Sequence, residues 1–198
     1  KLFENLIQNE IVTYIDKFLS PFLSRYRKDY STQAALISLI EKWKICLDNK
    51  GFLGAVLMDL SKTFDTINHQ LLIVKLNAHG SSKQALSIVL CYLTNRKQRV
   101  KINNTFSSSK DLNNSVQQGS VLGPLLFNTY LNNLFFALKN AHICNFADDT
   151  IPFVCRKNIE NVLVSLEKNY ISAIYWFHQN YMKLNTDKCH LLVSGHKN

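Results

Sequence analysis

The sequence has no long apolar run. Its uninterrupted apolar stretches, such as 88–93, stop far short of the roughly 20 residues needed to cross a bilayer, so no membrane span is expected. Its first ten residues lack the apolar core of a secretory signal, and the chain begins with lysine. We therefore expect an internal piece of a longer protein, without a membrane partner.

The sequence also lacks cysteines at the spacings typical of metal sites or disulfide frameworks. The five cysteines are an odd number, widely spaced and without a C-x-x-C pair, so neither a disulfide framework nor a zinc site is expected. A reducing compartment fits this pattern best. The cysteines are Cys46, Cys91, Cys144, Cys155 and Cys189.

Acidic residues are few. Asp plus Glu number 14 against 23 Lys plus Arg, a net charge of +9, which favours a polyanionic partner such as nucleic acid. The alternative is a basic surface with no partner. No repeat or low-complexity tract occurs, and 46% apolar content in 198 residues allows one large domain or two small ones with a buried core.

Periodicity, caps and turn residues predict an α+β domain with a mostly antiparallel sheet. A hairpin is expected to turn at 103–104, with a polar loop over 103–115. Pro152 lacks an N–H, so its strand should be an edge strand or locally irregular. The expected helices are about 2–19, 31–49, 66–80, 82–93, 124–138 and 159–181, and the expected strands about 52–60, 98–102, 143–147, 150–155 and 189–193.

Three carboxylates stand at the ends of expected strands. Asp59 follows an apolar run, and Asp148 and Asp149 lie at the expected tip of a hairpin. If the strands are neighbours, these groups suit a pair of divalent metal ions, since Mg²⁺ prefers oxygen ligands. The alternative is an ordinary Asp-Asp turn. The sequence does not fix whether Asp59 and Asp148 meet.

Three motifs occur in a characteristic order: Met-Asp-Leu-Ser-Lys-Thr-Phe-Asp-Thr at 58–66, Gln-Gly-Ser-Val-Leu-Gly-Pro at 118–124, and Phe-Ala-Asp-Asp at 146–149. With them the chain resembles the reverse transcriptase domain of non-LTR retrotransposons, the jockey-like group in particular. Segments 24–36 and 182–195 resemble the flanking motifs, so the resemblance covers nearly the whole chain.

The resemblance implies a polymerase palm, an antiparallel sheet with packed helices and a ferredoxin-like core, together with partial fingers and without the thumb. Residues 1–50 and about 81–115 would be fingers-like, and 51–80 and 116–198 palm-like.

Roles for individual residues follow from the same resemblance. Asp59, Asp148 and Asp149 match the metal-binding, catalytic carboxylates, and the Leu60 carbonyl would help to hold a metal. The implied cofactor is two Mg²⁺ ions, with Mn²⁺ as a substitute.

Other positions match nucleotide-contacting residues, each with a simpler alternative. Phe64 matches the residue that blocks a ribose 2′-hydroxyl, or is a core aromatic. Gln118 and Gly119 match the loop that lines nucleotide and template, or form a helix-entry turn. Arg27 matches a triphosphate-binding arginine, or is a surface residue. Lys188 matches a lysine that protonates pyrophosphate, or is simply solvated.

The densest basic cluster in the sequence lies at 96–101 and suits a phosphate backbone, although an exposed hairpin would also carry it. Its members are Arg96, Lys97, Arg99 and Lys101. The chain also departs from the family pattern without losing a metal ligand. The departures are Phe146 for Tyr, Thr63 for Ala, Gln117 for Pro, Ser115 for Gly, Asn133 for Asp, and Pro152 within a strand.

The resemblance predicts an RNA-directed DNA polymerase that acts on an RNA template, a DNA primer and deoxynucleoside triphosphates. The parent polyprotein would supply a thumb and an endonuclease domain, in an intracellular ribonucleoprotein of nucleus and cytoplasm. One alternative is a decayed fragment that binds nucleic acid without polymerising. A cyclase-like palm is disfavoured, because it would not need the loop at 118–119.

Overall fold

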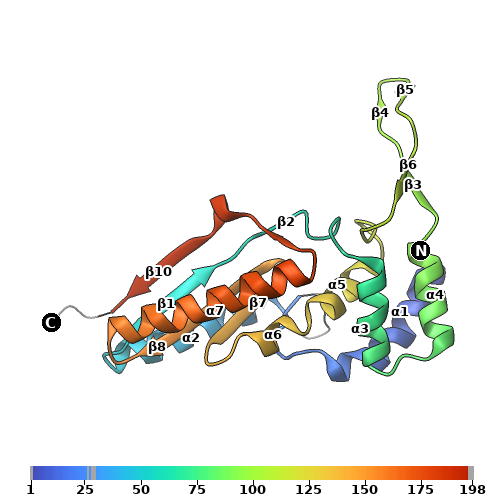
Figure 1. The fold of residues 1–198 in the computed structure, drawn as a ribbon. Helices are drawn as coiled ribbons and strands as arrows, with labels where there is room; N and C mark the ends of the chain where they lie inside the picture. The colour runs from blue at the N-terminus through green and yellow to red at the C-terminus, as the bar shows by residue number, and fades with distance from the viewer. Residues whose placement is uncertain (1, 26, 28–29, 196–198) are drawn as a thin grey trace. The chain divides into compact units, whose positions relative to one another are not determined.

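The computed structural model describes residues 2–25, 27 and 30–195 (Figure 1). The chain forms two compact units, each described by itself below. Unit 1 consists of residues 1–18 and 64–130, and unit 2 of residues 19–63 and 131–198. The predicted division into fingers-like and palm-like segments stays a prediction.

Unit 2 is built on a four-stranded antiparallel sheet with strand order β10-β1-β8-β7. Beyond the end of β1, strand β2 pairs with β9 in a separate short antiparallel ladder. The α+β class and the antiparallel sheet are thus confirmed. The strands are β1 (Phe52–Leu57), β2 (Leu60–Ser61), β7 (His142–Phe146), β8 (Asp149–Arg156), β9 (Lys183–Leu184) and β10 (His190–Ser194).

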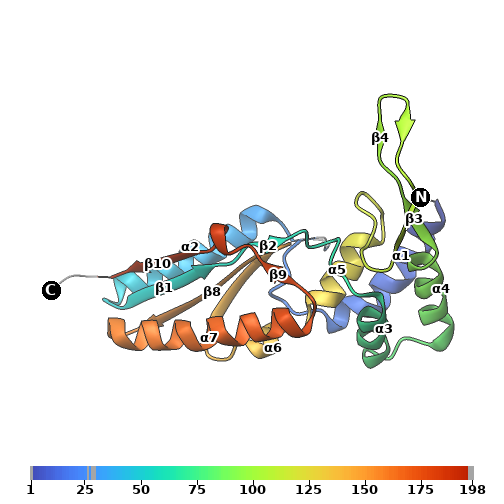
Figure 2. The same cartoon turned by 45° about the horizontal axis from the view of Figure 1, so that its top comes forward.

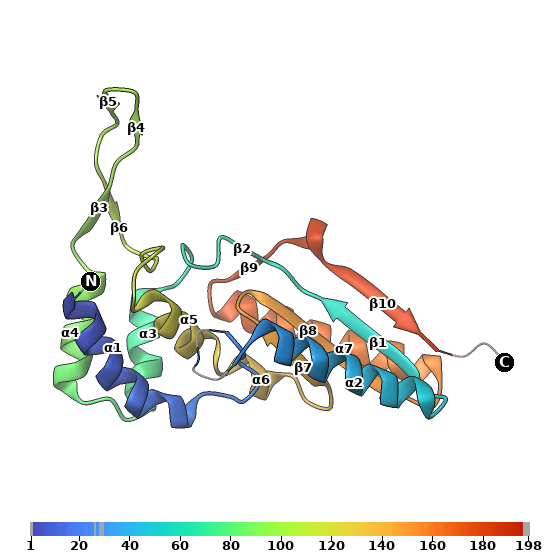
Figure 3. The ribbon, with the colours of Figure 1, turned by 180° about the vertical axis from the view of Figure 1, so that it is seen from behind.

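Helices α2 (Thr32–Asp48) and α7 (Ile159–Gln179) cover opposite faces of this sheet (Figures 2 and 3). Side chains alternate between the faces of a strand, and β1 follows this rule. Leu53 and Ala55 pack with buried residues of α2, whereas Gly54 faces α7. The predicted caps are present, since Ser31 accepts a hydrogen bond from the amide of Ala34 at 3.1 Å.

Strand β8 lies between β1 and β7, so Pro152 is not on an edge strand. The other prediction for this proline, local irregularity, is confirmed. The ladder with β1 ends at the pair Ala55 and Phe153 and resumes only at the bridge between Met58 and Thr150. Pro152 lies in the gap between these pairs, because it has no N–H to donate to the ladder.

Cys46 and Cys155 form a disulfide, with Cα atoms 6.0 Å apart and a separation of 109 positions in sequence. The expectation of no disulfide is therefore wrong for this pair. The two cysteines come from α2 and β8, which pack against each other, and sequence spacing carries no signal of that proximity. The remaining three cysteines are free.

Unit 1 contains helices and a long β-hairpin.

The helix predicted over 124–138 is interrupted at 132–133. There the side-chain carbonyl of Asn132 accepts a hydrogen bond from the amide of Ser20 at 2.6 Å, both within unit 2. The helices on either side are α5 (Gly123–Leu131), which crosses the boundary, and α6 (Leu134–Ala137) in unit 2. The other helices of unit 1 are α1 (Leu2–Ile15), the 3₁₀ turn Asp16–Phe18, α3 (His69–Ala78) and α4 (Lys83–Leu93).

The hairpin of unit 1 turns at Asn103 and Asn104 as predicted. The segment predicted as a polar loop includes its returning strand, since residues 105–106 and 110–112 pair with the outgoing strand. The strands are β3 (Arg96–Gln98), β4 (Lys101–Ile102), β5 (Thr105–Phe106) and β6 (Lys110–Leu112).

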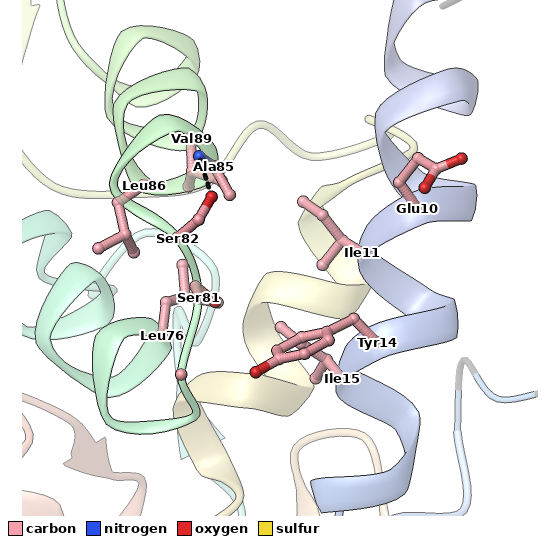
Figure 4. Close-up of a pocket in the computed structure, with 11 residues that line it drawn as sticks. Glu10, Ile11, Tyr14, Ile15, Leu76, Ser81, Ser82, Ala85, Leu86 and Val89 are labelled. Carbon is pink, nitrogen blue, oxygen red and sulfur yellow. Dashed lines mark hydrogen bonds between the residues drawn. The ribbon is translucent and has the colours of Figure 1, made fainter.

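An apolar pocket of about 270 Å³ opens between α1 and the start of α4, within unit 1. Figure 4 shows Ile11, Tyr14 and Ile15 pointing from α1 into it. The Tyr14 hydroxyl donates a hydrogen bond to the carbonyl of His79 at 2.9 Å, which ties α1 to the end of α3. In the described part of the chain, none of the helices has both the length and the apolar character needed to span a bilayer.

Lys75 of α3 is buried, with 8% of its surface exposed. Its ammonium donates to the carbonyl of Tyr130 at 2.5 Å and lies 4.3 Å from the centre of that ring. Burial disfavours the charged form and lowers the pKa of Lys75 from 10.5 to about 7.

Gly54→Ala should destabilise unit 2. A Cβ at this position would clash with the side chains of Val162 and Leu166 on α7. Overpacking of this kind costs about 1–3 kcal/mol. Urea unfolding should show the loss, while Ala55→Gly, on the opposite face, serves as a control that removes a methyl group without a clash. An unchanged midpoint for Gly54→Ala would contradict the close approach of α7.

Stability should rise with pH between about 7 and 10 because of Lys75. The folded pKa lies below the unfolded value, so the unfolded chain binds more protons in this window, and stability increases by up to about 1.4 kcal/mol per pH unit. Below pH 7 the contribution of this lysine is flat. Urea unfolding at several pH values should show that Lys75→Met abolishes this part of the rise; equal slopes in both proteins would contradict the lowered pKa.

Candidate active site

Asp59 is positioned by backbone bonds on both sides. The neighbouring residue, Met58, exchanges two backbone hydrogen bonds with Thr150 of β8, at 3.0 and 3.1 Å. The Asp59 carbonyl accepts a hydrogen bond from the amide of Asn185 at 2.9 Å. These contacts hold Asp59 beside the start of β8, which carries Asp149.

Asp148 lies in the two-residue turn that joins β7 to β8. Phe146 pairs with Asp149 across the ladder, so Ala147 and Asp148 form the tip, and Ala147 has a positive φ of 60°. The predicted hairpin is confirmed. The segment is therefore a tight turn, as the simpler alternative predicted. It also carries Asp148 and Asp149, and the charge of Asp59 acts on Asp149.

Asn145 fixes this turn and was missed by sequence reasoning. Its side chain is buried, and its amide nitrogen lies 3.0–3.1 Å from the carbonyls of Ala147 and Asp149 and from the Thr150 hydroxyl. An amide group bonded in this way determines the course of the backbone on both sides of Asp148. The sequence signal was an asparagine just before the Phe-Ala-Asp-Asp motif, with nothing to show that it points inward.

The three carboxylates interact electrostatically. Burial raises the pKa of Asp149, and the negative charges of Asp148 and Asp59 raise it further, while the positive charges of Lys188 and Arg25 oppose this shift. The structure thus places Asp59 and Asp148 near enough to Asp149 for their charges to act on it.

The chemistry of the donor set suits a divalent metal, because the predicted ligands are all oxygen atoms and a cation would offset the repulsion of Asp149 by Asp148 and Asp59. In the described ranges, no three acidic, His or Cys side chains are already close enough to enclose a metal ion. Leu60, the other expected ligand, pairs with Leu184 of β9, and its carbonyl accepts a hydrogen bond from the Thr63 hydroxyl at 3.4 Å.

Lys188 lies near the site, at the end of the short 3₁₀ turn Thr186–Lys188. Its ammonium is 3.8 Å from Oδ2 of Asp59. The lysine side chain is 68% exposed, so this ion pair contributes little to stability, and the ammonium stays accessible to a ligand.

Of the two described arginines in the 24–36 segment, Arg25 is the one whose charge acts on Asp149. Its guanidinium lies 5.0 Å from the centre of the Phe146 ring. Arg27, the residue singled out from the sequence, instead donates to the carbonyl of Ser20 at 3.0 Å and lies 4.5 Å from the Tyr30 ring. The arginines are two positions apart, so the motif alone did not distinguish them.

The remaining predicted residues lie in unit 1. Phe64 is half-buried and stacks on Phe127 with ring centres 5.1 Å apart, which agrees with the core-aromatic alternative. Gln118 and Gly119 are exposed in the loop before α5. Gly119 has a φ of +74° and open space where a Cβ would stand, so it is needed for backbone conformation.

Ser115 marks a real departure from the family pattern. It replaces an expected glycine and is held at a φ of +101°, a conformation that strains any residue with a side chain. Its amide bonds to the carbonyl of Ile67 at 2.9 Å, and its carbonyl lies 2.7 Å from Nε2 of His69. The serine therefore keeps a backbone shape suited to glycine.

Comparisons with known proteins show which family the chain resembles. Residues 1–197 match the family model described as reverse transcriptase (RNA-dependent DNA polymerase). The chain is 26% identical, over 96% of its length, to the RNA-directed DNA polymerase from mobile element jockey of Drosophila melanogaster. It is also 26% identical, over 95% of its length, to the probable RNA-directed DNA polymerase from transposon BS of the same fly.

Solved structures show the same fold. Apo telomerase from Candida tropicalis, truncated from its C-terminal domain, matches with a TM-score of 0.69 and 14% identity, over 98% of this chain and 41% of that one. Telomerase from Candida albicans in complex with a fragment of telomeric RNA matches with a TM-score of 0.68 and 12% identity, over 98% and 35%.

The chain spans 22% of the length of each of the two curated fly relatives. The family match, however, extends over almost all of its residues. The chain belongs to the reverse transcriptase (RNA-dependent DNA polymerase) family.

Proposed function

We propose that the chain is the polymerising part of a non-LTR retrotransposon protein, which copies RNA into DNA. The observation that carries the proposal is the effect on Asp149, at the start of β8, of the charges of Asp148 in the adjoining turn and of Asp59 between β1 and β2. The family match over residues 1–197 supports it. The RNA template, DNA primer and deoxynucleoside triphosphates are part of the proposal.

Asp59, Asp148, Asp149 and the Leu60 carbonyl would hold two Mg²⁺ ions, or Mn²⁺ in their place. Bound there, the ions would supply positive charge that favours loss of the proton from the attacking hydroxyl and stabilises the leaving oxygen. In the proposed reaction the primer 3′-hydroxyl loses its proton to solvent, its oxygen forms a bond to the α-phosphorus of the nucleotide, and the bond from that phosphorus to the pyrophosphate oxygen breaks.

The chain's own groups would position the reactants and move a proton. Lys188 is accessible beside Asp59 and is the proposed proton donor to the departing pyrophosphate. Arg25 adds positive charge at the site, which suits a triphosphate. The proposed nucleotide contacts of Arg27, Phe64 and the 118–119 loop rest on their motif positions.

A second candidate function is nucleic-acid binding without polymerisation. Ser115 favours it, because the strained serine stands next to the loop that would line the nucleotide. The net charge of +9 would support such binding without any catalytic step.

Asp148→Asn should abolish primer extension on poly(rA)/oligo(dT) with Mg²⁺. Loss of a metal ligand removes several kcal/mol of transition-state stabilisation, so we expect the rate to fall at least about a hundredfold. Binding of the primer–template should be unchanged or slightly tighter, because a negative charge is lost. The assay uses a polypeptide that includes the expected thumb.

The matched control is Asp48→Asn, the same change at an exposed carboxylate at the end of α2. It should extend primers like the unmodified chain. Undiminished extension by Asp148→Asn would refute the polymerase mechanism proposed for this site. Absence of extension from every form, with binding intact, would instead support the second candidate.

Asn145→Ala should impair the site through the position of Asp148 and Asp149. Loss of the buried amide leaves backbone carbonyls unpaired and should cost about 1–3 kcal/mol of stability. The turn would also hold its carboxylates less precisely, so the Mg²⁺ concentration for half-maximal extension should increase severalfold in assays run well below the unfolding temperature.

Asn169→Ala is the control for this experiment. Asn169 is also a buried asparagine whose amide donates to a backbone carbonyl, that of Ser165 in α7 at 2.8 Å. It should lower stability without changing the Mg²⁺ requirement. Equal Mg²⁺ dependence in the two variants would show that Asn145 acts on stability alone.

A further inference from the structure

The hairpin of unit 1, residues 96–112, is an exposed arm. Figure 1 shows it projecting from α3 and α4 of the same unit. Every residue from Lys97 to Asp111 is exposed, including large apolar ones. Val100 is 55% exposed, Ile102 69% and Phe106 47%. An isolated two-stranded hairpin is only marginally stable in water, so a partner that covers the arm would stabilise it.

The arm holds a large share of the chain's positive charge. It contains five basic residues and one acidic residue, a net charge of +4, whereas the whole chain has +9. Its acidic residue, Asp111, pairs with Lys97 at 3.5 Å, but both side chains are at least 65% exposed and the pair is weak. The charge therefore favours a polyanion and disfavours a purely apolar or basic partner.

Three cations follow one another along the outgoing side of the arm. Lys97 lies in β3 and Lys101 in β4, and Arg99 lies between these two strands. Phe106 is the cross-strand partner of Lys101. The Arg99 guanidinium lies 4.0 Å from the Phe106 ring centre and the Lys101 ammonium 5.4 Å, so both cations lie beside this ring.

A partly exposed aromatic ring among cations indicates the type of nucleic acid. Cations alone bind the phosphates of single strands and duplexes alike. An aromatic ring adds stacking energy only when bases are unpaired and free to leave their own stack. We therefore propose that the arm binds single-stranded nucleic acid, with phosphates on Lys97, Arg99 and Lys101 and a base against Phe106.

This inference shares with the proposed function only the premise that the chain handles nucleic acid. The contact is sequence-independent, because none of its groups reads the edge of a base. It also requires neither metal nor catalysis, so it is tested separately from the carboxylate site.

The test is fluorescence anisotropy of the full chain with a labelled 20-nucleotide oligouridine, in EDTA and over a series of salt concentrations. The triple variant Lys97→Gln, Arg99→Gln, Lys101→Gln should bind at least tenfold more weakly near 0.1 M salt. The slope of log K against log salt should fall by about 2, because three phosphate contacts of about 0.7 each are lost.

The matched control removes three exposed lysines elsewhere: Lys44→Gln, Lys157→Gln and Lys168→Gln. It has the same net charge as the arm variant and should keep most of the affinity. Equal losses in the two triple variants would overturn the proposal, because only overall charge would then matter.

Phe106→Ala distinguishes single-strand binding from duplex binding. It should weaken oligouridine binding about tenfold with an unchanged salt slope, since stacking is worth about 1–3 kcal/mol per base. Competition by a 20-base-pair duplex should be weaker than competition by the single strand, and unaffected by this variant. Equal competition, or no effect of Phe106→Ala, would overturn the single-strand assignment. Circular dichroism checks that each variant keeps its fold.

Discussion

The exchange of backbone hydrogen bonds between Met58 and Thr150 is the contact on which the candidate site depends. It joins β1 to β8 beyond the gap at Pro152 and brings Asp59 next to the hairpin that carries Asp148. Without this bridge, only the ladder between residues 52–55 and 153–156 would hold β1 against the hairpin. Backbone pairing thus places Asp59 near Asp149 although their charges repel.

The carboxylates are held together against their own charge. Folding must offset the burial and the repulsion that together raise the pKa of Asp149, and the bonds made by the buried Asn145 contribute to this by fixing the turn. Lys188 and Arg25 supply partial compensation from two separate loops. If the proposed metal ions bind here, they would meet carboxylates that the backbone already holds in place.

Local signals in the sequence were sufficient to predict most helices, strands and turns. Ser31 caps α2, and the asparagine pair at 103–104 forms the predicted turn, because short-range chemistry determines caps and turns. The order of the motifs also located the three carboxylates. Features that depend on tertiary packing could not be predicted. At the helix break, Asn132 bonds to Ser20, which lies 112 positions away in sequence, and Arg25 differs from Arg27 only in its surroundings.

The disulfide between Cys46 and Cys155 makes the chain a covalent ring with two tails. The long segment of unit 1, residues 64–130, lies entirely inside this ring, and so does the exposed arm. A single cut in the arm would therefore open the ring without separating the chain into two molecules. As long as the disulfide is intact, α2 and β8 stay joined, and the sheet of unit 2 keeps the segments from both sides of the cut.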